Sequence, residues 1–354
     1  MLISTAVVLV LVTLLPLSRS RRWYIRAMDF PRVQIAAMSL LWLVSWTFSD
    51  TTGGFMLGAS TVCVIAVLVY QLYWITPNTQ LHDVEIQKYL PERQRSLGSI
   101  RLLSSNVLTH NRNAQALLDL VAKHDPDILV TLESDQWWQE QLDTLENYPH
   151  RMQCPLDNLY GMHIYSRLAL ENPCIDFLVE TDKPSMNVTV ILESDQRIKL
   201  FLAHPAPPAP NENTESIERD VELLLIARKV AKMTDPVIVV GDLNDVAWSA
   251  TTRLFREISG LKDPRIGRGL YNTFNARHWF IRWPLDHVFV SKHFKLNEVQ
   301  RLPDIGSDHF PLLAEFTLTQ SHIDAGSTTQ TPTEPELLEQ TLETDVAQQS
   351  SLQQ

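Results

Sequence analysis

Three long uncharged stretches near the start of the chain dominate its pattern of hydrophobic and polar positions. They cover residues 2–18, 33–49 and 55–75. A membrane-spanning helix needs roughly 20 apolar residues, with about 17 as the lower limit. The third stretch exceeds this length, and the first two fit short or tilted spans. We therefore predict a membrane region over residues 1–75 with about three transmembrane helices.

Other interpretations of these stretches stay open at this stage. A signal peptide is the alternative for the first stretch, although no basic residue precedes it and no small-residue cleavage site follows it. A buried hairpin of a globular domain is the alternative for the other two. Five arginines and one acidic residue lie between the first two stretches. The positive-inside rule places that loop, and by counting also the remainder of the chain, in the cytoplasm.

Beyond residue 75 the pattern changes to short β-rich apolar runs that alternate with helical stretches. Residues 76–97 form a polar linker, and the β-rich pattern fills residues 98–318. Helical stretches are expected at residues 113–124 and 215–232. Many strands with fewer helices favour two sheets packed face to face with helices outside. The expected strands are residues 100–105, 127–132, 162–165, 186–192, 198–203, 237–240, 286–290 and 312–316.

Charge is distributed unevenly along the 354 residues, so the mean hydropathy of −0.08 averages three unlike zones. Residues 1–95 carry eight Lys/Arg and five Asp/Glu, residues 96–320 carry 22 and 30, and residues 321–354 carry none and six. The last zone also lacks aromatic residues and cannot bury enough apolar surface to offset its chain entropy. We expect a disordered acidic tail over residues 319–354.

Polar side chains stand at the ends of several expected strands. Each alone has an ordinary explanation as a turn or helix-cap residue. Together their carboxylate and amide oxygens favour Mg²⁺, with Mn²⁺ or Ca²⁺ as alternatives, and their imidazoles suit general acid–base work. Three cysteines exclude a Cys-rich metal framework, and whether Cys154 and Cys174 pair stays open. The carboxylates, amides and imidazoles together are the components of metal-assisted phosphoester hydrolysis. The set is Asn106, Glu133, His204, Asp242, Asn244, Asp286, Asp308 and His309.

Six sequence blocks in order resemble the endonuclease/exonuclease/phosphatase superfamily. They read SSNVL, VTLES, LAHP, VVGDLND, PLDHVFVS and GSDHFPLL, within about residues 100–317. The apolar start followed by RWYIRAMDFPR is similar to a bacterial, membrane-anchored branch of YafD-like and teicoplanin-resistance-like proteins. The resemblance implies an α/β fold, a four-layer α/β/β/α sandwich preceded by transmembrane helices, with the active site at one end of the two sheets.

The resemblance also implies a metal site. By motif, Glu133 would be the principal Mg²⁺ ligand, with Asn106 beside it and Asp308 completing the shell. His287 is expected to be a packed or supporting histidine rather than a ligand.

Catalytic roles follow from the same motifs. The resemblance implies that Asp242 and Asn244 hold the phosphate and the attacking water. His309 would be the general base or the imidazole that polarises the phosphate, oriented by Asp286. His204 would be the second imidazole, acting on the phosphoryl oxygens or the leaving group.

Three further residues are candidate substrate contacts. Arg282 and Trp283 belong to an aromatic, basic stretch at residues 277–283, which suits a phosphate with an apolar group. An aromatic loop that only packs on the sandwich edge is the alternative. Arg167 could equally bind phosphate or form a structural salt bridge. Leu108 stands where apurinic endonucleases carry an acidic residue, which weakens an abasic-site repair function.

The preferred hypothesis is a membrane-anchored phosphatase or phosphodiesterase that acts on a phosphorylated lipid at the bilayer. A membrane-anchored nuclease is the alternative, but the acidic middle zone shows no basic stripe for nucleic acid. A non-enzymatic binding module is disfavoured because the motif residues are complete. The expected location is a bacterial inner membrane, in a multi-pass arrangement with the catalytic side left open. No protein partner is implied.

Overall fold

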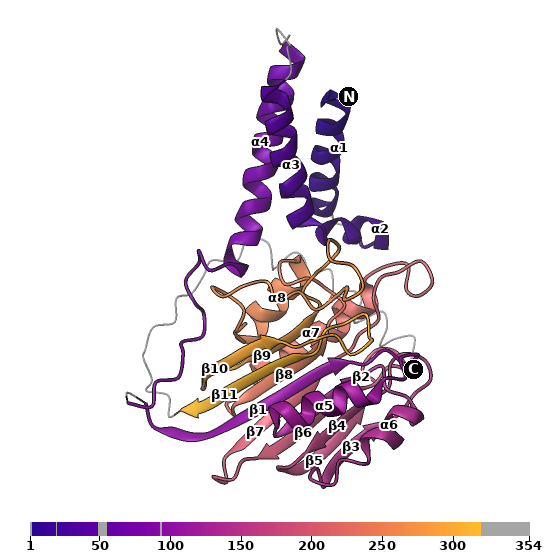
Figure 1. The fold of residues 1–354 in the computed structure, drawn as a ribbon, viewed down its shortest axis with the longest axis vertical. Coiled ribbons are helices and arrows are strands. Elements are labelled where there is room, and N and C mark those ends of the chain that lie inside the picture. The colour runs from indigo at the N-terminus through magenta and orange to yellow at the C-terminus, as the bar shows by residue number, and fades with distance from the viewer. Residues whose placement is uncertain (1, 19, 49–54, 93, 320–354) are drawn as a thin grey trace. The chain divides into compact units, whose positions relative to one another are not determined.

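The computed structural model describes residues 2–18, 20–48, 55–92 and 94–319 (Figure 1). The expected acidic tail falls outside these residues. The described chain forms two compact units. The first comprises Met1–Asp83 with Pro207–Ser216 and Ile266–Gly269, and the second comprises Val84–Ala206, Ile217–Arg265 and the chain from Leu270.

Helices make up the core of the first unit, and three of them pack together (Figure 1). Their contact is apolar and includes Leu9, Trp42 and Val64. Many other apolar side chains of these helices are exposed, such as Leu41 and Tyr73. The elements are α1 (Leu2–Leu14), η1 (Leu15–Leu17), α2 (Trp23–Arg26), η2 (Ala27–Asp29), α3 (Arg32–Thr47), α4 (Phe55–Ile75) and η3 (Thr76–Asn78).

One helical segment of the described residues is long and apolar enough to cross a membrane. This segment is Met56–Asn78, and it includes all but the first residue of the third predicted span. Helices also form where the first two spans were predicted, but α1 has 13 residues and α3 has 16. Both are shorter than a typical span. The described residues thus agree with a single span by length and composition, and the multi-pass arrangement stays a prediction.

The second unit is built on two β-sheets (Figure 1). The first sheet has the order β10-β11-β1-β2-β4-β3, and the second has the order β5-β6-β7-β8-β9. The strands are β1 (Ser96–Asn106), β2 (Ile128–Leu132), β3 (His150–Cys154), β4 (Met162–Ser166), β5 (Ala169–Asp176), β6 (Ser185–Ile191), β7 (Arg197–Leu202), β8 (Val237–Asp242), β9 (Asp286–Val290), β10 (Phe294–Arg301) and β11 (Leu312–Thr319).

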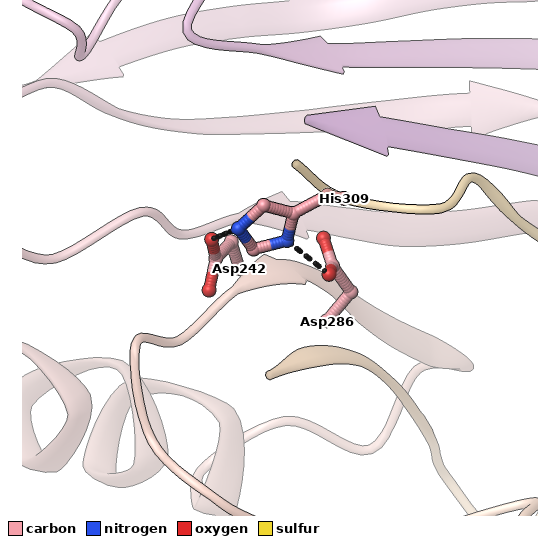
Figure 2. A group of neighbouring side chains, drawn as sticks. All are labelled: Asp242, Asp286 and His309. Atoms are coloured by element: carbon pink, nitrogen blue, oxygen red, sulfur yellow. Dashed lines mark hydrogen bonds and ion pairs between the residues drawn. The ribbon is translucent and has the colours of Figure 1, made fainter. Parts of the chain in front are cut away.

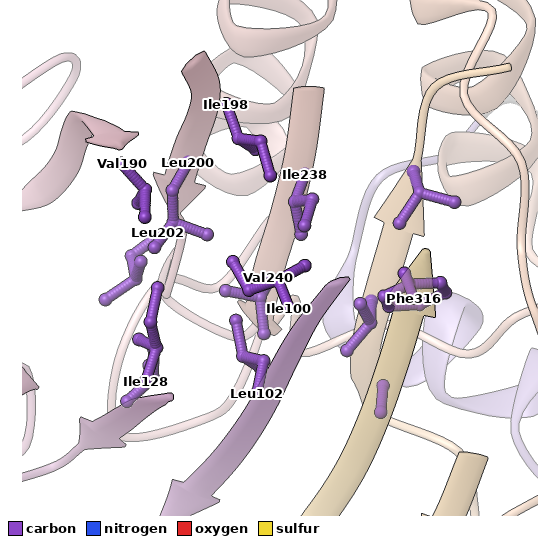
Figure 3. Close-up of a cluster of buried hydrophobic side chains, with 14 of the residues drawn as sticks. Ile100, Leu102, Ile128, Val190, Ile198, Leu200, Leu202, Ile238, Val240 and Phe316 are labelled. Atoms are coloured by element: carbon purple, nitrogen blue, oxygen red, sulfur yellow. The ribbon is translucent and has the colours of Figure 1, made fainter. Parts of the chain in front are cut away.

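Alternate residues of the central strands fill the space between the sheets (Figure 3). Leu102 of β1 and Leu200 of β7 point into this shared core, whereas Leu103 and Phe201 point outward. This period of two is what a pleated strand produces when both of its faces are covered.

Helices cover the outer face of each sheet. Helices α5 (Ala114–His124) and α6 (Gln136–Leu142) share an apolar cluster with the first sheet. Helices α7 (Ile217–Ala231) and α8 (Ala250–Ser259) share a separate apolar cluster with the second sheet. The unit is a mixed α/β fold with two sheets, in agreement with the four-layer sandwich that the resemblance implies.

Three strands were absent from the sequence prediction. All three are edge strands: β5 has mostly exposed side chains, and β3 and β10 are only partly buried. Part of the predicted linker also packs, since Tyr89 N donates to Leu296 O at 2.9 Å. Cys154 and Cys174 are both free thiols in this structure.

Candidate active site

Four strand ends meet at one end of the two sheets and bring most of the predicted site together. Asn106 is the last residue of β1, and Glu133 follows β2 directly. In the second sheet, Asp242 ends β8 and lies directly opposite Asp286, which begins β9. The Asn106 side chain joins the two sheets, because its Nδ2 donates to Glu133 Oε1 at 2.7 Å and to Asp242 Oδ2 at 3.2 Å.

His309 lies between two carboxylates (Figure 2). Its Nδ1 is 2.7 Å from Asp286 Oδ2, and its Nε2 is 3.4 Å from Asp242 Oδ2. Burial alone would lower the pKa of His309, but the charges of Asp286 and Asp242 outweigh burial and raise it to about 10. The surroundings therefore favour the imidazolium form of His309.

Glu133 presents a carboxylate oxygen that lacks a protein partner. Its backbone adopts a left-handed φ of 57°, and its carbonyl accepts a hydrogen bond from Thr109 Oγ1 at 2.8 Å. Burial raises the pKa of Glu133 to about 7. Among the described residues, Glu133 Oε2 and Asp308 Oδ1 are both buried without a hydrogen-bond partner. Buried oxygens of this kind cost free energy unless a cation or a donor satisfies them, so they fit a divalent ion.

A second set of possible metal ligands coincides with the histidine network. Ligand atoms of Asp242, Asp286 and His309 lie within 4.8 Å of one another. Both ring nitrogens of His309 already face carboxylate oxygens, however, and an ion here would have to displace those contacts. Glu133 and Asp308 therefore fit a metal better. Asn106 can join them, because among the described residues its Oδ1 accepts a single hydrogen bond, from Leu108 N at 3.1 Å.

His204 and Asn244 line the second-sheet side of the site. His204 Nε2 lies 4.0 Å from Asp242 Oδ2, and the ring packs against Tyr160 with centroids 5.1 Å apart. Burial lowers the pKa of His204 to about 4, so this imidazole is neutral near pH 7. Asn244 N donates to Asp242 Oδ1 at 2.9 Å, and its Nδ2 donates to Pro205 O at 3.0 Å.

The structure does not place Arg167 at the site, and we withdraw it as a substrate contact. It follows the C-terminal end of β4, where Ser166 pairs with Ile128 at the start of β2. Because β4 runs antiparallel to β2, this end of β4 lies away from Glu133. Arg167 forms a salt bridge with Asp125 instead.

Arg282 and Trp283 lie beside the site. Trp283 pairs with Phe274 through the backbone, and their rings stack with centroids 6.1 Å apart. The ring of Phe274 is 4.9 Å from that of His309. Arg282 Nε donates to the carbonyl of His278 at 3.1 Å. The aromatic stretch at residues 277–283 is thus connected to His309.

Two buried arginines hold the backbone of the site, and the sequence analysis missed both. Arg265 Nη1 donates to Asp286 O at 3.1 Å, and its Nη2 lies 2.6 Å from His287 Nδ1. His287 Nε2 reaches Asp245 O at 2.9 Å, which gives His287 the supporting place expected for it. Arg219 Nη1 donates to Asn244 O at 2.9 Å. No local motif marks these arginines, because the site groups that they hold, Asp286, His287 and Asn244, are distant from them in sequence.

Residues 103–309 match the sequence profile of the Endonuclease/Exonuclease/phosphatase family. The match covers more than half of the chain, and the chain belongs to this family. It is accordingly a divalent-metal-dependent hydrolase that acts on phosphoester bonds. No curated protein gives a significant match to the sequence.

Solved structures support the fold. The chain is similar to the human Nocturnin catalytic domain with bound sulfate, at 18% identity and a TM-score of 0.52 over 64% of this chain and 96% of that one. It is also similar to D. rerio TDP2 complexed with a single-strand DNA product, at 17% identity and a TM-score of 0.51 over 62% and 98%. An endonuclease/exonuclease/phosphatase from Beutenbergia cavernae gives 15% identity and a TM-score of 0.50 over 62% and 72%.

Proposed function

We propose that the chain is a membrane-anchored, Mg²⁺-dependent phosphoesterase that hydrolyses a phosphate ester or pyrophosphate of a lipid. The main support is an exposed aromatic tip connected to His309. Trp279 is 81% exposed and Phe280 is 55% exposed. Both belong to the loop between Phe274 and Trp283, and Phe274 forms a β-bridge with His309. Exposed Trp and Phe favour a membrane interface or an apolar substrate group over water.

Glu133, Asp308 and Asn106 would hold the metal. Their oxygen donors favour Mg²⁺, with Mn²⁺ and Ca²⁺ as alternatives. When bound, the ion would neutralise charge that develops on the phosphoryl oxygens.

The remaining side chains would bind the phosphate and direct the attacking water. Asp286 orients His309, and the imidazolium form favoured there suits a group that polarises a phosphoryl oxygen. Asp242, held by Asn106 and Asn244, is placed to accept a hydrogen bond from the water. His204 is neutral near pH 7 and can donate a hydrogen bond to the phosphoryl or leaving oxygen.

We further propose that the first unit anchors the enzyme in a bacterial cytoplasmic membrane. The segment Met56–Asn78 has the length and composition of a span. The arginines that precede α3 favour the cytoplasm for their loop, whereas a cell-wall lipid substrate would require the site on the outer side. The side of the membrane therefore stays open in this proposal.

Phosphate release from a polyprenyl pyrophosphate by the full-length protein in detergent tests the proposal. We expect release that requires Mg²⁺, stops with EDTA and is lost in Glu133→Ala and His309→Ala. Glu140→Ala is a matched control, because Glu140 is exposed on α6. A folded wild-type protein that releases no phosphate from the lipid would overturn the lipid assignment.

A nuclease is the second candidate, favoured by the similarity to D. rerio TDP2 complexed with single-strand DNA. The surplus of acidic residues in positions 96–320, 30 against 22 basic ones, opposes binding to a phosphate backbone. Cleavage of single-stranded DNA by the wild type and not by Glu133→Ala, with no release from the lipid, would establish the nuclease instead.

A further inference from the structure

Two arginines stack on one aromatic ring next to the catalytic histidine. The ring belongs to Phe310, which follows His309 in the chain. The guanidinium carbons of Arg282 and Arg301 lie 4.9 Å and 4.4 Å from its centroid. The two guanidinium carbons are therefore at most about 9.3 Å apart. Cation–π contact of this kind uses the face of a guanidinium and holds it in place, so N–H groups at its edge that do not already donate within the protein can bind a ligand.

No acidic side chain among the described residues forms a salt bridge with either arginine. Arg301 Nη1 donates to Asn272 O at 3.0 Å, and Arg282 donates to backbone carbonyls such as that of His278. Burial and the charge of Arg282 lower the pKa of Arg301. In contrast, Arg265 is paired with a carboxylate, that of Asp263. Within the described residues the Arg282–Arg301 pair thus carries two positive charges without a carboxylate partner, in a protein of net charge −11.

The segments that carry these arginines also carry the catalytic groups. Asn272, which accepts from Arg301, precedes Thr273, and Thr273 Oγ1 accepts from Asp286 N at 3.1 Å. Arg282 precedes Trp283, whose ring partner Phe274 lies against His309. An anion bound by the arginine pair would therefore lie beside the group that is attacked.

We propose that Arg282 and Arg301 form a second anion subsite, which binds a phosphate group of the substrate other than the one attacked. This rests on the proposed phosphoesterase function and narrows its substrate class to molecules with two neighbouring phosphates. Among the described residues Arg301 has one hydrogen-bond acceptor, the carbonyl of Asn272, which leaves several of its five N–H donors for phosphate oxygens. The neighbouring phosphate belongs to a diphosphate ester or to the next nucleotide of a nucleic acid.

Calorimetric titration of the full chain in detergent, with Mg²⁺ in excess and pyrophosphate supplied as its non-hydrolysable methylene-bridged analogue, tests the subsite without hydrolysis. Inorganic pyrophosphate spans both positions and inorganic phosphate fills only one, so we expect the wild type to bind pyrophosphate more tightly. Arg301→Gln and Arg282→Gln should each weaken pyrophosphate binding at least about tenfold and phosphate binding less than about twofold. Arg301→Lys should recover part of the loss because it keeps the charge.

Arg277→Gln is the matched control, since Arg277 is an exposed arginine of the same loop and does not stack on Phe310. This variant should leave the affinity for both pyrophosphate and phosphate unchanged. Retained phosphate binding shows that each variant is folded. Equal weakening of both ligands, or no weakening of pyrophosphate, would overturn the subsite. If Arg301→Gln fails to fold, Arg282→Gln alone decides the question in the same way.

Turnover then identifies the source of the second phosphate. Arg301→Gln should raise the KM for a polyprenyl pyrophosphate about tenfold more than the KM for the corresponding monophosphate. A rise in the KM for single-stranded DNA, without such a rise for the lipid, would instead assign the subsite to a nucleic acid. Hydrolysis with an equal rise in KM for all substrates would overturn the subsite but leave the proposed function intact. Tight, arginine-dependent binding of pyrophosphate without hydrolysis of any lipid would support the subsite but overturn the proposed function.

Discussion

Asp286 Oδ2 lies 2.7 Å from His309 Nδ1, and Asp286 is at the same time the direct cross-strand partner of Asp242. The β8–β9 pairing therefore places one carboxylate on each nitrogen of the same imidazole. This arrangement fixes the ring orientation and keeps Nε2 directed at the Asp242 side of the site. It makes the catalytic histidine dependent on the register of one strand pair.

Asp286→Asn should abolish most of the activity while the fold survives. An amide cannot supply the charge that raises the pKa of His309, so the imidazole should titrate at lower pH and lose its fixed orientation. We expect kcat to fall by about 10²–10⁴-fold with little change in KM. The measurements are steady-state kinetics and the pH dependence of kcat.

Asp119→Asn is the control for this variant, because Asp119 is exposed on α5. It should match the wild type in both kcat and pH profile. A retained kcat in Asp286→Asn would show that the contact with His309 is structural only.

Glu133→Gln should separate two effects of Glu133: the cost of its buried charge to stability and its part in metal binding. In metal-free protein, burial raises the pKa of Glu133 from 4.5 to about 7, so this residue costs stability as pH rises from about 4.5 through 7. Removing the charge should stabilise metal-free protein at pH 8 by up to about 3 kcal/mol. The same change removes a metal ligand, so added Mg²⁺ should stabilise only the wild type. Thermal unfolding with EDTA or Mg²⁺ measures both effects.

A variant less stable than the wild type in EDTA at pH 8 would contradict the burial argument for Glu133. Equal stabilisation of both proteins by Mg²⁺ would show that the ion binds elsewhere, for example at the cluster around Asp242.

The strand-end residues could be located from sequence because their positions follow from local patterns. Apolar runs predict where β1, β2 and β8 end, and neighbouring strands bring residues such as Asn106, Glu133 and Asp242 to one edge. Arg167 could not be placed in this way, because the direction of β4 relative to β2 depends on long-range pairing. Arg282 was a candidate from the sequence, but its partner on Phe310, Arg301, was hidden because it lies on β10, an edge strand with a polar pattern that was not predicted.

Arg265→Lys should lower activity although Arg265 touches no substrate. A lysine keeps the positive charge next to Asp263 but loses the forked donors that reach Asp286 O and His287. Because these contacts position the catalytic backbone, we expect kcat to fall about tenfold with KM nearly unchanged. Steady-state kinetics should be combined with thermal unfolding.

Arg265→Met would be a less informative change, since it leaves the buried carboxylate of Asp263 unpaired at a cost of about 3–5 kcal/mol. Arg253→Lys on α8 is a suitable control because Arg253 Nε donates to the carbonyl of Ser249, the residue that caps the same helix. A rise in KM without a fall in kcat in Arg265→Lys would assign this arginine to substrate binding rather than positioning.

Glu222 provides a pH-dependent test of the fold that is independent of catalysis. It is buried on α7, and its Oε1 accepts a hydrogen bond from Ser185 Oγ at 2.8 Å. Burial raises the pKa of Glu222 from 4.5 to about 7. The unfolded chain therefore releases this proton at lower pH than the folded chain does, and stability falls as pH rises from about 4.5 through 7. Glu222→Gln removes this loss, so it should add up to about 3 kcal/mol to the free energy of unfolding at pH 8 and little at pH 4.

Chemical denaturation at the two pH values measures the difference, with Glu140→Gln as the exposed control. A gain of the same size at both pH values would mean that packing, rather than the buried charge, accounts for it.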